Sequence, residues 1–180
     1  MNDTKNIIHA TLEIAQKVGW EKVSVRAISK EIGYSTIKIY SDFGSKEELL
    51  FRVQKKGFEI LRSDYIKATD SSDRPEVTLK NLALTHIRFA LKKPTYYELM
   101  FDYKFESCKS KSANIKKAVG SLIHEVIKRI TDTNSSIAFL QFYAMLYGFI
   151  QITKDFSHHK DFDMETATIQ FVENFVNGIK

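Results

Sequence analysis

The segment Thr36–Phe43 carries side chains whose chemistry suits the edges of DNA base pairs. A lysine ammonium donates hydrogen bonds to O6 and N7 of guanine, and an isoleucine side chain contacts the methyl group of thymine. Lys38 and Ile37 supply these two groups, and Thr36 and Ser41 add hydroxyls. These side chains read base pairs together only if a helix presents them on one side.

The local sequence predicts such a helix and a partner helix before it. Val25, Ile28 and Ile32 recur at spacings of three and four, which places them on one apolar stripe of a helix. Gly33 follows at once, where a sharp turn favours a residue that tolerates positive φ. Ser35 then offers a hydroxyl as N-cap of the second helix. Two helices joined by a tight glycine turn are typical of a helix-turn-helix.

One further helix is predicted before this pair and one after it. Ile7, Ile14 and Val18 lie on one stripe of a helix over residues 3–18. Ser45, with Glu48 three residues later, predicts a capping box that opens a long helix over residues 46–69.

The rest of the chain predicts more helices and short connections. Apolar residues at helical spacing indicate helices over residues 75–92, 94–104, 112–131, 135–156 and 164–179. Pro75 stands at a first helical position, and Asp163 is the predicted cap of the last helix. The predicted fold class is therefore all-α, with about nine helices.

The composition excludes some classes of protein but does not indicate a function. The net charge is +5, but residues 1–50 hold seven Lys or Arg and seven Asp or Glu, so charge does not itself indicate a nucleic-acid surface. The single cysteine, Cys108, excludes an internal disulfide framework and favours a cytoplasmic location. We expect no secretory signal and no membrane span, because no basic-then-apolar leader and no run of about 18 apolar residues is evident.

The order of these residues resembles the TetR family of bacterial transcriptional regulators over roughly residues 5–55. The resemblance rests on glycine, serine and aromatic positions at matching spacing: Gly19, Ser24–Val25–Ile28, Gly33–Ser35, Ile39–Tyr40–Phe43 and Ser45–Lys46–Glu47–Leu49. It implies a DNA-binding domain over residues 1–48 and an effector-binding and dimerisation domain over residues 49–180. It also implies a dimeric repressor that binds a palindromic double-stranded DNA operator and is released by a small molecule.

The predicted DNA contacts lie at the start of the second helix, on the third helix and at the start of the fourth. They are Ser24, Arg26, Ser35, Thr36, Ile37, Lys38, Tyr40, Ser41 and Lys46. The chain departs from the family pattern at Ile37, Lys38 and Asp42, which are positions that select the operator sequence.

Aromatic residues are frequent after residue 85, and most of them must pack in a core. By resemblance, some line a pocket for a small hydrophobic or aromatic effector. The predicted ligand contacts are His86, Phe89, Tyr97, Met100, Phe101, His124, Phe142 and Tyr143.

The last two predicted helices are apolar over more than one face, so each must be buried on more than one face. The resemblance implies that they form a four-helix interface with a second copy. The alternative is a monomer with a larger core. The predicted interface residues are Phe139, Tyr147, Gly148, Gln151, Phe171 and Phe175.

No pattern in the sequence indicates an enzyme, a metal site or a cofactor. His158, His159, Asp161 and Asp163 cluster, but they lack the spacing of a preorganised zinc site, and a solvated loop is the better interpretation. Two alternatives stay open. One is a TetR-like dimer that has lost DNA binding and acts as a protein adaptor. The other is a helical enzyme, which would place a titratable pair inside the aromatic pocket.

Overall fold

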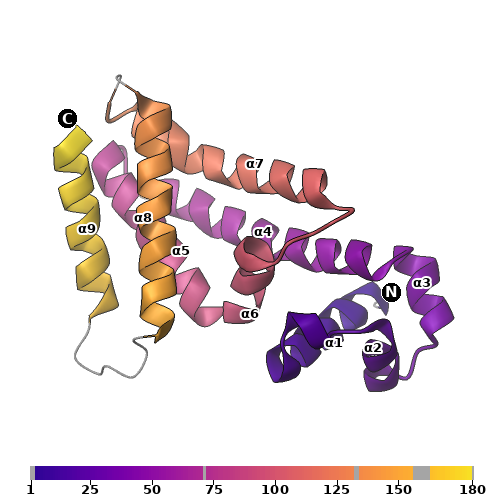
Figure 1. Ribbon diagram of the computed structural model, residues 1–180. Coiled ribbons are helices and arrows are strands. Elements are labelled where there is room, and N and C mark those ends of the chain that lie inside the picture. Colours follow the sequence, from indigo (N-terminus) through magenta and orange to yellow (C-terminus); the bar gives the residue numbers. More distant parts are fainter. Residues whose placement is uncertain (1–2, 71, 132–133, 156–162, 180) are drawn as a thin grey trace. The chain divides into compact units, whose positions relative to one another are not determined.

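The computed structural model describes residues 3–70, 72–131, 134–155 and 163–179, and over these residues the chain is helical without strands (Figure 1). The predicted all-α class is confirmed. The helices are α1 Asp3–Val18, α2 Val25–Ile32, α3 Thr36–Phe43, α4 Lys46–Thr69, α5 Pro75–Lys92, α6 Pro94–Tyr97, α7 Lys109–Lys128, α8 Ser135–Asp155 and α9 Met164–Ile179. A 3-10 turn, η1, covers Trp20–Lys22, and a π-helix, η2, covers Glu98–Asp102.

The chain folds into two compact units. Unit 1 joins the residues up to Ile60 with Lys93–Lys116, and unit 2 joins Leu61–Lys92 with the residues from Lys117 onward. This division follows contacts in space, so it differs from the domains at residues 1–48 and 49–180 that the sequence suggests.

The helix-turn-helix forms because its caps and its turn satisfy the backbone locally. The Ser24 hydroxyl accepts from the Ala27 N–H at 3.1 Å, and the Ser35 hydroxyl accepts from the Lys38 N–H at 3.2 Å. Gly33 ends α2 with φ of 71°, a left-handed conformation that a side chain would strain. The predicted helix bounds and caps are confirmed here.

Residues 93–116 complete the core of unit 1. The Trp20 indole N–H donates to the Thr95 carbonyl at 3.0 Å. The buried Gln54 amide donates to the Leu99 carbonyl at 3.0 Å. Both contacts join the N-terminal helices to a segment more than forty residues away in the sequence, as the separations of 75 and 45 residues show.

The predicted helix over residues 94–104 is wrong in its second half. After four α-helical residues the chain widens into η2 and ends at Asp102. Gln54 bonds two carbonyls of this π-helix, those of Leu99 and Met100. Gly57 allows the close approach, because a Cβ there would lie 2.5 Å from the Met100 sulfur. These are tertiary contacts, which a local pattern does not contain.

Helix α7 begins three residues earlier than predicted and ends three residues earlier. Its start at Lys109 is preceded by the N–H groups of Glu106 and Ser107, which donate to the Glu47 carboxylate. Its end is a tightened turn, in which the Arg129 N–H donates to the Val126 carbonyl at 3.1 Å.

Unit 2 is built by α5, α8 and α9 with parts of α4 and α7. Phe142 of α8 packs against two rings of α9, with centroids 5.6 Å from Phe171 and 5.1 Å from Phe175. Asp163 caps α9 as predicted, because its carboxylate accepts from the Glu165 N–H at 3.0 Å. Hydrogen bonds from Thr166 and then from Glu165 lower the pKa of Asp163.

Candidate nucleic-acid interface and effector region

Helix α3 is anchored by two residues and exposes the rest. Ile39 and Phe43 are buried in unit 1, whereas 80% of Ile37 is exposed. Tyr40 is half exposed and Ser41 is exposed. With 3.6 residues per turn, Ile37, Lys38 and Ser41 share the side opposite the anchors. The structure therefore brings three of the four predicted reading residues onto one face, whereas Thr36 is half-buried.

Lys38 and Asp42 form an ion pair on this helix. The Lys38 ammonium donates to the Asp42 carboxylate at 2.7 Å, one turn apart. In the sequence the two residues stand out only as separate departures from a family pattern. The structure shows that they are one unit, and the signal was their spacing of four residues.

The predicted DNA contacts outside α3 have different surroundings. Ser24 and Arg26 are exposed at the start of α2, next to the first turn of that helix. Ser35 is exposed and caps α3, and Thr36 is half-buried. Ser24 and Arg26 therefore have the exposure that a phosphate contact requires.

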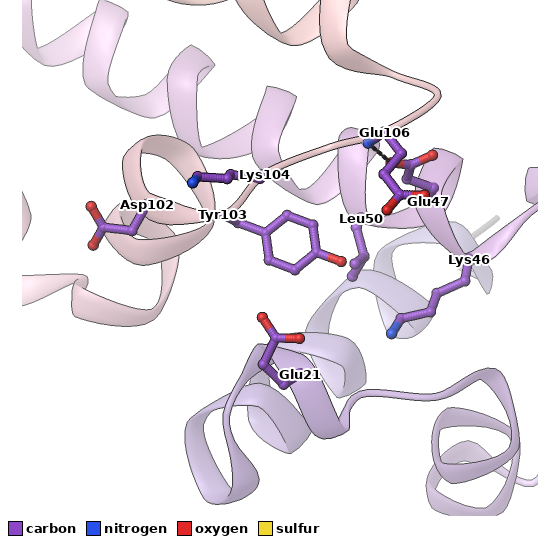
Figure 2. Close-up of a pocket in the computed structure, with 8 residues that line it drawn as sticks. All are labelled: Glu21, Lys46, Glu47, Leu50, Asp102, Tyr103, Lys104 and Glu106. Atoms are coloured by element: carbon purple, nitrogen blue, oxygen red, sulfur yellow. Dashed lines mark hydrogen bonds between the residues drawn. The ribbon is translucent and has the colours of Figure 1, made fainter.

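Lys46, at the start of α4, lines a polar cleft of about 550 Å³ within unit 1. Figure 2 shows the Tyr103 ring in the middle of this cleft. The lining residues are Glu21, Lys46, Glu47, Leu50, Asp102, Tyr103, Lys104 and Glu106. Burial raises the pKa of Tyr103, and the carboxylates of Glu21, Glu47 and Glu106 raise it further. Acidic side chains dominate this lining, which disfavours a phosphate inside the cleft, so the predicted phosphate contact of Lys46 would have to form at its rim.

The first turn of α4 is capped on one side only. The Ser45 hydroxyl accepts from the Glu48 N–H at 3.0 Å, which confirms the serine cap. The Glu48 carboxylate, predicted to reach back to Ser45, instead accepts from the Lys111 ammonium at 2.8 Å and from the Cys108 thiol at 3.5 Å. The Lys111 hydrogen bond is the main cause of the lowered pKa of Glu48. The reciprocal half of the predicted capping box is therefore wrong.

Cys108 is a buried free cysteine just before α7, and its position is that of a structural residue. Burial raises its pKa, and the Glu48 carboxylate raises it further. A thiol with a raised pKa stays protonated near neutral pH and is a poor nucleophile.

Five aromatic rings follow one another through unit 2. The Tyr65 hydroxyl hydrogen-bonds the Nδ1 atom of His86, whose ring centroid lies 6.4 Å from that of Tyr143. Phe139 continues the series at 5.9 Å from Tyr143 and 5.3 Å from His124. The structure therefore groups three predicted ligand residues, and it adds Tyr65, which was not predicted from the sequence.

Two features of this aromatic series concern its polar atoms. Complete burial lowers the pKa of His86 to about 3, so its imidazole is neutral at physiological pH. The Nε2 atom of His124 is buried, and no described residue hydrogen-bonds it. A buried nitrogen of this kind has a free energy cost that a ligand or a water relieves.

The other predicted ligand residues lie elsewhere. Phe89 is buried in α5, and Phe142 faces α9. Tyr97, Met100 and Phe101 belong to unit 1, where Phe101 contacts Phe58 with ring centroids 5.4 Å apart. The predicted set therefore consists of two groups in two units.

Helix α8 has one buried and one exposed apolar stripe. Phe142, Leu146 and Ile150 are buried. The opposite stripe is exposed, with Leu140 at 66%, and it contains Ile137, Leu140, Met145 and Ile152. We call these four residues the α8 stripe. They were not predicted as a group from the sequence, although Leu140, Met145 and Ile152 follow Ile137 by 3, 8 and 15 residues, which keeps them on the same side of a helix.

The interface residues predicted from the sequence do not all lie on the side of the α8 stripe. Phe139 and Phe175 contact rings inside unit 2. Gly148 lies between stripe residues, and a Cβ there would have no atom within 4 Å. Ser135–Thr153 is also long and apolar enough to cross a membrane, by length and composition alone, which was not expected from the sequence. Only 28% of that stretch is buried.

Residues 7–53 match the family model of the bacterial regulatory proteins of the tetR family. Over these residues, about a quarter of its length, the chain is similar to the regulators of the TetR family. No curated protein matches the sequence, but solved structures share the fold of the whole chain.

Three solved structures show how far this TetR fold extends. A protein of unknown function from Rhodococcus sp. RHA1 has a TM-score of 0.86 at 17% identity, covering 98% of this chain and 94% of that one. FadR from Bacillus subtilis, in complex with stearoyl-CoA, has a TM-score of 0.80 at 15% identity, covering 98% and 99%. The TetR family regulator PfmR from Thermus thermophilus has a TM-score of 0.74 at 17% identity, covering 97% and 98%.

The TetR family and these named neighbours are regulators, not enzymes. The buried Tyr65–His86 pair agrees with this, because a neutral histidine with a pKa of about 3 is a weak general base. Within the described residues no three His, Cys, Asp or Glu side chains are grouped to bind a metal. His158, His159 and Asp161 lie outside the described residues.

Proposed function

We propose that this TetR-type regulator is a repressor that binds a roughly palindromic operator as a homodimer and leaves it when a small hydrophobic or aromatic effector binds. The exposed face of α3 carries the proposal. A helix anchored by Ile39 and Phe43 that exposes Ile37, Lys38 and Ser41 has the form of a recognition helix. Such a protein acts in the cytoplasm, where the DNA is.

Each exposed group has a defined role in this proposal. Ile37 contacts a thymine methyl group, and Lys38 donates to guanine. Tyr40 hydrogen-bonds a phosphate through its hydroxyl, and Ser24 and Arg26 hold a second phosphate at the start of α2. These phosphate contacts supply affinity, and the two base contacts supply sequence preference.

The α8 stripe supports the homodimer. An apolar face of four large side chains, exposed on a helix without charged residues between Ile137 and Ile152, is stabilised by burial against a second apolar face. A symmetric dimer presents two copies of α3 to two half-sites about 34–36 Å apart on DNA.

The aromatic series of unit 2 supports the effector site. Its rings offer apolar surface, and the buried Nε2 atom of His124 offers one polar contact. The FadR neighbour was solved with stearoyl-CoA, which indicates that this fold accommodates an acyl ligand. The effector releases DNA only by as much as its affinity differs between the two states of the dimer.

The test begins with DNA binding. Genome-wide operator mapping, starting with the DNA upstream of this gene, is combined with fluorescence anisotropy on the mapped duplex and on random duplex DNA. We expect binding to weaken linearly with the logarithm of salt concentration and to prefer the mapped duplex. Negligible binding to either duplex at low salt would contradict the proposal and favour the protein adaptor.

A further inference from the structure

The charge pair of α3 is oriented against the dipole of its own helix. Lys38 is the third residue of α3 and Asp42 the seventh of its eight residues. The positive end of a helix dipole is its N-terminus, so a cation is favoured in the last turn and an anion in the first. Helix α3 has no acidic residue in its first turn and no basic residue in its last. The helix dipole therefore does not account for this arrangement.

The pair does fix the position of a flexible cation. A lysine side chain has four rotatable methylene groups and many rotamers in solvent. The Lys38 ammonium lies 2.7 Å from the Asp42 carboxylate, and Asp42 is the less exposed partner, with 24% of its side chain exposed against 44% for Lys38. Asp42 thus holds the ammonium on α3, whose exposed face also carries Ile37 and Ser41.

We propose that Asp42 is a specificity-determining residue, which positions Lys38 to read guanine and keeps it from pairing with phosphate; this rests on the proposed DNA binding. The Asp42 carboxylate accepts from the Lys38 ammonium, which is a cation with N–H donors and no acceptor. Guanine presents two acceptors in the major groove, O6 and N7. A carboxylate at this position also repels the phosphate backbone, so it lowers the affinity for random DNA and leaves the base contact.

The experiment selects binding sites from a random duplex library and compares five chains with the wild type. Four are Asp42→Asn, Lys38→Ala, the double variant, and Asp64→Asn as the matched control; the fifth chain, Asp42→Glu, keeps the carboxylate. Asp64 pairs with Lys67 at 3.7 Å on α4, so Asp64→Asn makes the same change in charge away from α3. Thermal melts establish that each variant is folded.

We expect Lys38→Ala to lower the preference for guanine at one operator position by about tenfold or more. Asp42→Asn lowers the same preference by about fivefold and raises affinity for random duplex by about twofold to threefold. In the Lys38→Ala background, Asp42→Asn leaves the base preference unchanged, because its effect acts through Lys38. Asp64→Asn leaves the preference unchanged. Asp42→Glu, which keeps the carboxylate, restores most of it.

Each other outcome overturns the inference in a recognisable way. If Asp42→Asn selects the same sites as the wild type, Asp42 does not position Lys38, while the proposed function stands. If Asp42→Asn loses a cytosine preference and keeps the guanine preference, Asp42 reads a base itself. If the wild type binds no duplex even at low salt, the proposed function fails, and this inference fails with it.

Discussion

Two helices of this protein expose large apolar side chains, and they do so in opposite chemical settings. On α3, Ile37 and Tyr40 alternate with Lys38, Ser41 and Asp42. On α8, the exposed stripe runs through a segment that has no charged residue from Ile137 to Ile152. Exposure of an apolar residue therefore does not by itself identify a partner; the polar residues beside it do.

The difference sets the forces that each surface uses. A mixed surface such as that of α3 suits DNA, whose grooves present methyl groups beside hydrogen-bonding edges and phosphates. An apolar surface such as the α8 stripe suits another apolar surface, and its association gains from area removed from water. The two surfaces must therefore respond differently to mutation and to salt.

The largest expected effect is on the α8 stripe. Leu140→Glu places a carboxylate in the centre of the proposed dimer interface, where it would be buried without a partner. We expect the dimer dissociation constant to rise by about a hundredfold or more, measured by sedimentation at several protein concentrations.

A matched control for this variant is Leu91→Glu. Leu91 lies on α5 and is 49% exposed, but it is not part of the α8 stripe. It should leave the dimer intact. A wild-type protein that is monomeric at every concentration, or a Leu140→Glu protein that stays dimeric, would contradict the proposed interface.

The next largest effect is that of salt, which should distinguish the DNA-binding surface of α3 from the α8 stripe. Raising salt from 0.1 M to 0.3 M should weaken DNA binding by roughly tenfold or more, because bound cations are released from phosphates. The same change should alter the dimer dissociation constant by less than about twofold, because an apolar interface is not screened. Anisotropy and sedimentation in the same buffers measure both; an equal response of the two would remove the distinction.

Acid should destabilise unit 2, which contains α8 and the buried His86. The His86 ring contacts Tyr143 of α8. The pKa of His86 is lowered from 6.5 to about 3, so the unfolded chain binds a proton that the folded chain excludes. Stability is full above about pH 6.5 and is lost as pH falls toward 3. Between pH 8 and pH 5.5 we expect a loss of roughly 1.5 kcal/mol in the free energy of unfolding, measured by urea titration.

His86→Gln tests the origin of that loss. Glutamine keeps a hydrogen-bonding group near Tyr65 but has no proton to gain in this range. The variant should be less stable at pH 8 and should lose little further stability at pH 5.5. An unchanged pH dependence would assign the effect to another group.

The smallest expected effect is on the exposed apolar residue of α3. Ile37→Ser removes the proposed contact with a thymine methyl group and should lower affinity for the operator by about threefold to tenfold. The dimer dissociation constant should not change, and neither should the salt dependence of DNA binding, because no phosphate contact is lost. A changed oligomeric state would place Ile37 in a protein interface.

Much of the fold could be predicted because its signals are local. Ser24, Ser35 and Asp163 are caps whose hydrogen bonds reach only two or three residues along the chain. The π-helix could not be predicted, because it depends on Gln54 and Gly57 of a different helix.

The candidate sites also could be predicted only where their signals are local in the sequence. The exposed face of α3 could be predicted from a short periodic segment and its caps. The effector residues could not be placed, because an apolar or aromatic residue has the same local pattern in a core and in a pocket. Tyr65 and His86 illustrate this, since they meet across 21 residues of sequence.

The packing of residues 93–116 against the N-terminal helices bears on how such regulators are rebuilt in the laboratory. A fragment that stops soon after residue 53, where the family model ends, lacks the Thr95 carbonyl that Trp20 binds and the π-helix that Gln54 binds. It would leave Leu50 and Phe51 without partners such as Leu99 and Phe105. A chimaera that transplants the helix-turn-helix of this protein onto another regulator should therefore carry two pieces of the chain, the residues up to about Ile60 and Lys93–Lys116.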